Sequence, residues 1–247
     1  NPHILSNTGT SRAEHVSRET LTQPVRDHNY YHSVDYEALY RFRFEGVDSA
    51  SKHAVWKVIA ADLSRRAGKP RRVLDPACGS GEFILGVPAE ERWAADVVAP
   101  TIDDPAVRVA VGRYQDLELP TGYFDTILFS NVLEHLGGPD DVQEFLARAR
   151  TQLAPGGRVV IMGPNFKYCA KEYFDCADHT LVLTDVAVVE HLVAAGYDVS
   201  ISVPRYIPYS FRSRLPANPR LTAAYLRAPF VWRFLGKQFL VIATPRQ

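Results

Sequence analysis

The chain has 247 residues, of which 46% are hydrophobic and 23% charged, a composition typical of one soluble globular domain and not of a disordered chain. Its 28 basic residues balance 28 acidic ones, which disfavours a nucleic-acid or anionic membrane partner. Three cysteines without a C-x-x-C pair fit neither a disulfide scaffold nor a closed zinc site, and they predict a reducing, cytoplasmic compartment. The polar first 30 residues and the absence of a long apolar run predict neither an export signal nor a membrane span.

The first part of the chain is predicted to lie outside the main domain. Residues 1–29 have little hydrophobic periodicity and are expected to form an arm that is ordered only by docking. Residues 34–63 have apolar side chains at helical spacing, and this pattern ends near Gly68 and Pro70. We therefore expect residues 1–69 to form an arm and a helical extension that packs on the core.

After Pro70, short β-rich runs alternate with helical patterns, which is typical of a parallel sheet. The predicted strands are 73–74, 93–97, 107–111, 124–129, 159–162, 199–203 and 238–244. The predicted helices are 139–153, followed by a stop and turn at 155–157, and 184–195, with Thr184 as N-cap and Gly196 after its end. The fold class is therefore α/β: a Rossmann-like, seven-stranded, mostly parallel sheet over residues 70–247, with helices on both faces. Residues 204–237, rich in Pro, Arg and aromatics, are expected to form an inserted substrate lid.

A strand, a glycine-containing turn and a helix follow one another at residues 73–83. Gly79 and Gly81 let the backbone bend sharply and approach a ligand closely. A dinucleotide-binding turn requires a further glycine where Ile84 stands, so the pattern disfavours NAD. Asp75 places a carboxylate beside the turn, which favours a ligand with a positive charge.

Further polar residues follow the next two predicted strands. Asp96 lies 21 positions after Asp75, about the spacing at which an acid meets ribose hydroxyls on the neighbouring strand. Residues 115–117 follow the third strand, where a carboxylate can accept a hydrogen bond from an adenine amino group. These positions together predict a ligand that contains both adenosine and an amino-acid-like group.

From residue 73 to 195 the sequence resembles the class I S-adenosylmethionine-dependent methyltransferases. The matching pieces are the 75–81 turn, Asp96, residues 116–117, 123–125, 130–136 and 153–157. The resemblance implies S-adenosylmethionine as cofactor and S-adenosylhomocysteine as product. The cofactor-binding residues that it implies are Asp75, Ala77, Cys78, Gly79, Gly81, Asp96, Val97, Gln115, Asp116, Leu117, Ser130 and Asn131.

The turn departs from the common pattern at Pro76 and Ala77, in a form familiar from adenine-specific DNA methyltransferases. Those enzymes carry an Asn/Asp/Ser-Pro-Pro-aromatic motif after the fourth strand, where this chain has Ser130, Asn131, Val132 and Leu133. We therefore predict a small-molecule acceptor and no nucleic-acid substrate.

Two histidines are candidates for catalysis because imidazole titrates near neutral pH. His135 follows the fourth strand on the acceptor side; alternatively, Glu134 and His135 only orient the following helix. His179 lies in the loop at 174–180; alternatively, its ring only satisfies loop backbone groups. Some relatives bind a metal through Glu-x-x-Glu-His, but Asn131 occupies the first of these positions, so no metal is predicted.

Aromatic and basic residues outside the motifs are candidates for the acceptor site, although plain packing or solvated arginines explain such residues equally well. They are Tyr31, Arg41, Arg205, Tyr209 and Arg212. The predicted reaction is O-methylation of a sugar, natural-product or similar metabolite hydroxyl. The alternatives are N- or C-methylation and a non-catalytic cofactor-binding protein, and the sequence leaves open whether the chain is a monomer or a homodimer.

Overall fold

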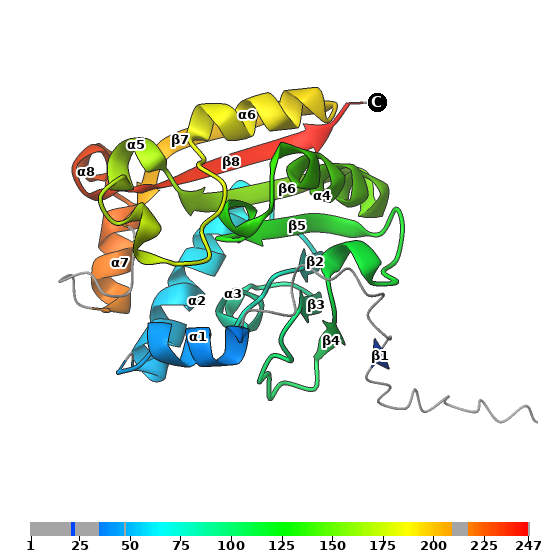
Figure 1. The fold of residues 1–247 in the computed structure, drawn as a ribbon, viewed down its shortest axis with the longest axis horizontal. Coiled ribbons are helices and arrows are strands. Elements are labelled where there is room, and N and C mark those ends of the chain that lie inside the picture. The colour runs from blue at the N-terminus through cyan, green and yellow to red at the C-terminus, as the bar shows by residue number, and fades with distance from the viewer. Residues whose placement is uncertain (1–20, 23–34, 47, 209–216, 247) are drawn as a thin grey trace, which may run out of the picture.

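A twisted sheet with helices on both faces forms the core of the computed structural model, which describes residues 21–22, 35–46, 48–208 and 217–246 (Figure 1). The strands are β1 (Leu21–Thr22), β2 (Arg72–Asp75), β3 (Glu91–Asp96), β4 (Val107–Val111), β5 (Phe124–Ser130), β6 (Leu153–Pro164), β7 (Tyr197–Ile207) and β8 (Gln238–Pro245). The α-helices are α1 (Tyr36–Arg43), α2 (Ser49–Arg66), α3 (Glu82–Gly86), α4 (Pro139–Gln152), α5 (Phe166–Cys169), α6 (Asp185–Ala194), α7 (Pro219–Leu226) and α8 (Pro229–Leu235). Three short 3-10 turns complete the described elements: η1 (Tyr114–Asp116), η2 (Leu133–His135) and η3 (Tyr173–Asp175).

The strand order is β1-β4-β3-β2-β5-β6-β8-β7, with β8 antiparallel to both of its neighbours and the other pairs parallel. The seven predicted strands are thus confirmed, and the two-residue β1 adds an edge strand beside β4. Chain order reverses between β2 and β5. In open α/β sheets ligands bind outside the carboxyl ends of the strands at such a point, and Asp75 and Ser130 stand at these two strand ends.

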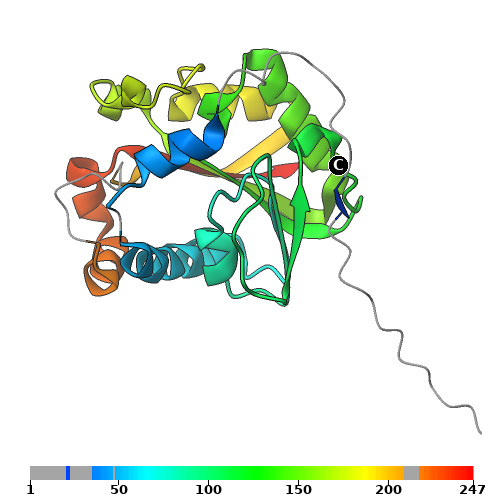
Figure 2. The ribbon, with the colours of Figure 1, turned by 60° about the horizontal axis from the view of Figure 1, so that its bottom comes forward.

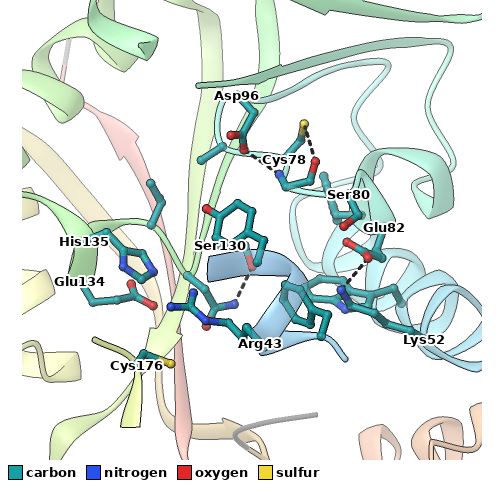
Figure 3. A pocket seen from close by; sticks show the side chains of 18 of the residues that line it. Arg43, Lys52, Cys78, Ser80, Glu82, Asp96, Ser130, Glu134, His135 and Cys176 are labelled. Carbon is teal, nitrogen blue, oxygen red and sulfur yellow. Dashed lines mark hydrogen bonds and ion pairs between the residues drawn. The ribbon is translucent and has the colours of Figure 1, made fainter. Parts of the chain in front are cut away.

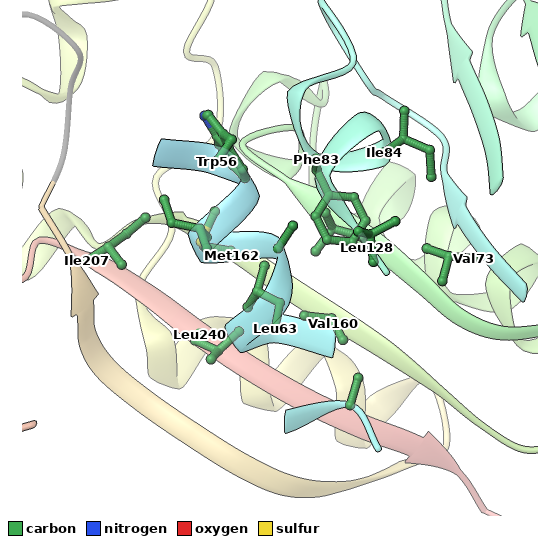
Figure 4. Packing of buried hydrophobic residues seen from close by; sticks show 14 of the residues in the cluster. Trp56, Leu63, Val73, Phe83, Ile84, Leu128, Val160, Met162, Ile207 and Leu240 are labelled. Carbon is green, nitrogen blue, oxygen red and sulfur yellow. The ribbon is translucent and has the colours of Figure 1, made fainter. Parts of the chain in front are cut away.

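Two apolar layers sandwich the sheet, since successive side chains of a strand point to opposite faces. In β6, Val160 and Met162 pack with helices α2 and α3, whereas Val159 and Ile161 pack with α4 and α6. Figure 4 shows the first layer, where Leu63 of helix α2 lies against the strands. Helices α2 and α6 consequently lie on opposite sides of the sheet (Figure 2).

Helix α2 is also fixed by a buried polar contact. Asp62 accepts hydrogen bonds from Arg66 Nε at 2.5 Å and from the Tyr206 hydroxyl, which lies in β7, at 2.8 Å. Both Asp62 and Tyr206 are buried. The helix therefore meets the far edge of the sheet through a satisfied buried carboxylate.

Local sequence patterns predicted the positions of several strands and helix ends correctly. The predicted strand 107–111 matches β4, and Thr184 caps α6 by accepting from the Ala187 amide at 3.2 Å. Gly196 has the positive φ of 76° expected after a helix end. Among the described residues, no helix is long and apolar enough to cross a membrane.

Two predicted boundaries were wrong. Residues 155–157, expected as a turn, belong to β6, which already begins at Leu153 with an irregular register against β5. Strand β7 runs to Ile207, so the first residues of the expected 204–237 insertion belong to the sheet and only α7 and α8 follow among the described residues. Apart from β1, the predicted arm at 1–29 lies outside the described residues, as do residues 209–216.

Candidate active site

A cavity of about 1480 Å³ opens at the carboxyl ends of β2, β3 and β5. It runs from the glycine turn after β2 to helices α1, α2 and α7 and to the loop at 172–179. Single small-molecule sites usually occupy about 300 to 1,000 Å³. The cavity therefore has room for two ligands side by side.

The turn after β2 forms one end of this cavity. The Cys78 amide donates to the Ala95 carbonyl at 3.0 Å, which ties the turn to β3. Gly79 and Gly81 have φ of 54° and 81°, and a Cβ on Gly81 would lie 2.8 Å from the Ile102 side chain. Glycine is thus required at position 81 both for its backbone conformation and for the close approach of Ile102.

Asp96 at the end of β3 holds this turn in place. One carboxylate oxygen accepts from the Gly79 amide at 2.8 Å (Figure 3). The other accepts from the Val98 amide at 3.1 Å. Burial raises the pKa of Asp96, although these backbone hydrogen bonds oppose the rise. Each oxygen keeps a second lone pair, so the carboxylate can still accept from a ligand hydroxyl.

Asp75 at the end of β2 is a buried acid, and one of its carboxylate oxygens lacks a hydrogen-bond partner among the described residues. It is 3% exposed, and the oxygen without a partner there is Oδ1. Burial raises the pKa of Asp75 to about 8. A cationic group at this end of the cavity would complete the site, which fits the ammonium group of an amino acid.

The end of β5 has an unusual backbone. Asn131 has a φ of 51°, which is uncommon for a residue other than glycine. Its amide donates to the Met162 carbonyl at 2.8 Å and its side chain donates to Ser130 Oγ at 3.1 Å. Such conformations concentrate at functional sites, and this one turns the chain into the cavity wall.

Three polar side chains contact one another along the cavity wall away from the glycine turn. His135 Nδ1 lies 3.0 Å from the Asp178 carbonyl oxygen and 3.3 Å from its carboxylate, and Arg43 of α1 pairs with the same carboxylate. Although burial opposes it, His135 and Arg43 hold the pKa of Asp178 below its usual value. Asp178 thus orients the His135 ring and joins it to helix α1.

His179 is buried beside His135, with the two ring centroids 4.9 Å apart. Burial and the neighbouring His135 lower the pKa of His179 to about 4, so its ring is neutral at physiological pH. Glu134 is also buried, and burial raises its pKa. Figure 3 shows Glu134 and His135 side by side on the wall that faces Arg43.

The structure brings most predicted site residues to the cavity. Its lining includes Asp75, Ala77, Cys78, Gly79, Asp96, Val97, Gln115, Ser130, Asn131, His135 and His179. Gly81, Asp116 and Leu117 do not line it: the Ile102 side chain packs close to Gly81, Asp116 is exposed, and Leu117 is buried in a small core cluster.

The predicted acceptor-side residues fare differently. Arg41 is exposed and does not line the cavity, whereas Arg43 does. Arg205 lies off the lining as well, because its guanidinium donates to the Gly236 and Phe234 carbonyls at 2.8 and 3.0 Å. Tyr31, Tyr209 and Arg212 lie outside the described residues.

Sequence reasoning missed one pair of charged residues and misplaced one contact. Lys52 and Glu82 form a buried ion pair of 2.6 Å at the cavity wall, and nothing in their spacing indicated it. For the α1 contact a signal existed, because Tyr36, Tyr40 and Arg43 follow the 4-then-3 spacing of one helix face. Arg41 lies off that face.

Comparisons with known proteins agree with this geometry. A family model described as "Methyltransferase domain" matches residues 51–191. CymA, a probable non-canonical nonribosomal peptide synthetase of Salinispora arenicola, is 30% identical in an alignment of 162 positions that covers 60% of this chain and 2% of that protein. The ribosomal protein L11 methyltransferase of Bradyrhizobium diazoefficiens is 31% identical in an alignment of 127 positions that covers 43% of this chain and 39% of that protein. The chain thus spans less than half the length of the curated relatives that it matches.

Solved structures show the same fold. A methyltransferase from Archaeoglobus fulgidus, described as SAM-dependent, has a TM-score of 0.56 at 20% identity, covering 85% of this chain and 99% of its own. The 1,6-didemethyltoxoflavin-N1-methyltransferase of Burkholderia thailandensis, solved with S-adenosylhomocysteine, has a TM-score of 0.54 at 22% identity and covers 92% and 94%. With more than half of its residues matched by the family model, the chain belongs to the methyltransferase domain family.

Proposed function

We propose that the chain methylates a hydroxyl oxygen of a small molecule. One observation carries this proposal: a single cavity of about 1480 Å³ joins the Asp75–Asp96 end to the wall formed by His135 and His179. The first end suits the cofactor, and the second presents two imidazoles to whatever lies beside the methyl group. Imidazole suits a hydroxyl acceptor because it can hold a hydroxyl proton.

The cofactor would lie along the carboxyl ends of β2 and β3. Asp75 would accept from its ammonium group, Asp96 would accept from its ribose hydroxyls, and Gln115 would face its adenine. When bound, S-adenosylmethionine supplies a methyl group on a positively charged sulfur. The residues of this chain mainly have to align the acceptor with that methyl group and exclude competing water.

Asp75 makes the predicted cofactor affinity depend on pH. In the free protein its pKa is raised to about 8, so the carboxyl is protonated at pH 6. A bound ammonium group favours the ionised form, so binding releases a proton below pH 8. The association constant for S-adenosylhomocysteine should therefore rise by up to about tenfold per pH unit from about pH 5.5 to 7.5, below the range where the ligand's own amino group titrates.

Calorimetric titration in two buffers with different ionisation heats measures both the affinity and the released proton. The Asp75→Asn variant should bind more weakly and lose the pH dependence, because its amide does not titrate. A wild-type affinity that stays constant over this range would contradict the assigned role of Asp75.

The nature of the acceptor is supported by the character of the site and by relatives. The second half of the cavity is bounded by apolar and aromatic side chains such as Leu221, Tyr225 and Tyr40. CymA is named as a nonribosomal peptide synthetase, which fits a natural-product acceptor. The three cysteines, which form no C-x-x-C pair, fit a reducing, cytoplasmic compartment.

N-methylation is the second candidate, because two similar structures are named as N-methyltransferases: the toxoflavin enzyme and NodS of Bradyrhizobium japonicum WM9. The test incubates the protein with methyl-labelled S-adenosylmethionine and a panel of hydroxyl acceptors, each matched with its amine analogue. Mass spectrometry of the products should locate the label on oxygen. Label on the amines alone would replace the proposal with the second candidate.

A further inference from the structure

Three metal-ligating side chains meet on the acceptor wall of the cavity. One ligand atom from each of Glu134, His135 and His179 lies within 4.8 Å of the other two. All three residues line the cavity, so an ion held between them would also face the space left for the acceptor. Glu134 and His135 lie in η2, and His179 lies in the loop before α6, 44 positions after His135.

Two of these residues carry buried atoms that lack a partner. Glu134 Oε1 and His179 Nδ1 have no hydrogen bond among the described residues, although Glu134 is 1% and His179 7% exposed. Burying an unpaired carboxylate oxygen and an unpaired ring nitrogen is costly. A cation between them would satisfy both atoms at once.

In each of the two histidines, one ring nitrogen is held by the protein and the other is left to bind an ion. His135 Nδ1 is engaged by Asp178, which leaves Nε2 as its ligand atom. His179 makes a hydrogen bond with the Tyr173 backbone while its Nδ1 has no partner. Metal-bound histidines almost always use their second ring nitrogen in this way, to fix the tautomer and the ring orientation.

We propose that Glu134, His135 and His179 bind one divalent cation whose remaining coordination positions face the acceptor. Two imidazoles and one carboxylate favour Zn²⁺, a borderline ion, and after it the harder Mn²⁺, over Mg²⁺, which prefers oxygen ligands. Bonds of about 2.0–2.2 Å would draw the ligand atoms from within 4.8 Å to roughly 3–3.5 Å of one another. The role of the ion's remaining coordination positions rests on the proposed hydroxyl acceptor. The existence of the cation site does not depend on that acceptor.

The proposed site takes one ligand from outside the Glu-x-x-Glu-His motif, on which the expectation of no metal rested. A Glu-x-x-Glu-His motif supplies its first ligand three positions before the second Glu, and Asn131 stands there in this chain. The structure provides a third ligand from outside the motif, because the loop at 176–180 returns to η2. Hydrogen bonds of 2.9 and 3.0 Å from the Thr180 and Leu181 amides to the Glu134 carbonyl hold the loop there.

Calorimetric titration of the chelator-treated full chain with ZnCl₂ and with MnCl₂ tests the site. Wild-type protein should take up one equivalent of at least one of these ions, and MgCl₂ should bind much more weakly. Both His179→Ala and Glu134→Gln should weaken the binding by at least about 10- to 100-fold. His53→Ala, which removes an exposed histidine of α2, should bind like wild type.

Thermal unfolding and an S-adenosylhomocysteine titration establish that each variant is folded, and Glu134→Gln preserves the shape of the side chain. The proposal is overturned if wild-type protein binds neither ion, or if the folded Glu134→Gln and His179→Ala variants bind both ions like wild type. The readout needs no acceptor, so a failure of the acceptor panel leaves it unaffected. Conversely, oxygen methylation that persists in the chelator-treated protein would overturn the role of the cation at the acceptor and would keep the proposed function.

Discussion

Replacing Asp96 by alanine is expected to weaken S-adenosylhomocysteine binding by at least about 100-fold. The substitution removes the hydrogen bonds that Asp96 accepts from the Gly79 and Val98 amides, at 2.8 and 3.1 Å, and it removes the acceptor assigned to the ribose hydroxyls. Hydrogen bonds to a charged group contribute about 1.5–3 kcal/mol each, and about 2.7 kcal/mol corresponds to 100-fold in affinity. Calorimetric titration at constant pH measures the change.

Asp103→Ala is the matched control, because Asp103 is exposed and does not line the cavity. It should bind the ligand like wild type. If a folded Asp96→Ala variant kept wild-type affinity, the cofactor would have to lie elsewhere in the cavity, and the assignment of the β3 end would fail.

The second large effect is expected for His135→Ala, which should lower turnover by about 100-fold or more while cofactor affinity stays unchanged. The ring lies on the acceptor wall and Asp178 fixes its orientation. Turnover should fall whether the His135 ring contacts the acceptor oxygen directly or acts on it through the proposed cation. Initial rates at saturating S-adenosylmethionine, with the acceptor identified from the panel, measure it.

His53→Ala should keep wild-type turnover and thus shows the effect of removing a histidine as such. Equal turnover in His135→Ala and wild type would assign Glu134 and His135 to the alternative role of orienting the following helix. The cofactor titration on the same samples separates a catalytic loss from a binding loss.

The cofactor half of the site could be predicted well because its signals are local. Asp75, Gly79 and Gly81 lie in one short segment, and the two glycines indicate its sharp turn directly. Asp96 follows at the expected spacing on the next strand. Strand alternation in β6 likewise separates Val160 from Val159 onto the two apolar layers. The sequence was sufficient where the conformation of one residue, or the two-residue alternation of a strand, determines where a side chain lies.

The acceptor half could not be predicted in this way because its contacts join distant segments. The Arg43–Asp178 ion pair connects residues 135 positions apart. His179 meets Glu134 only because the loop at 176–180 returns to the sheet. Arg205 had the right composition for a ligand contact, yet the extension of β7 to Ile207 placed its guanidinium against the backbone near Gly236.

The position of β8 in the sheet also affects the order in which the protein can fold. This strand is the last of the eight to leave the ribosome, yet it lies between β6 and β7 and pairs with both. Until Gln238–Pro245 has been synthesised, β7 has no partner, and one edge of β6 displays unpaired amides and carbonyls. The nascent chain must therefore keep two strand edges from pairing wrongly until β8 has been added, and the cavity wall at Ile207 and Gln238 closes only then.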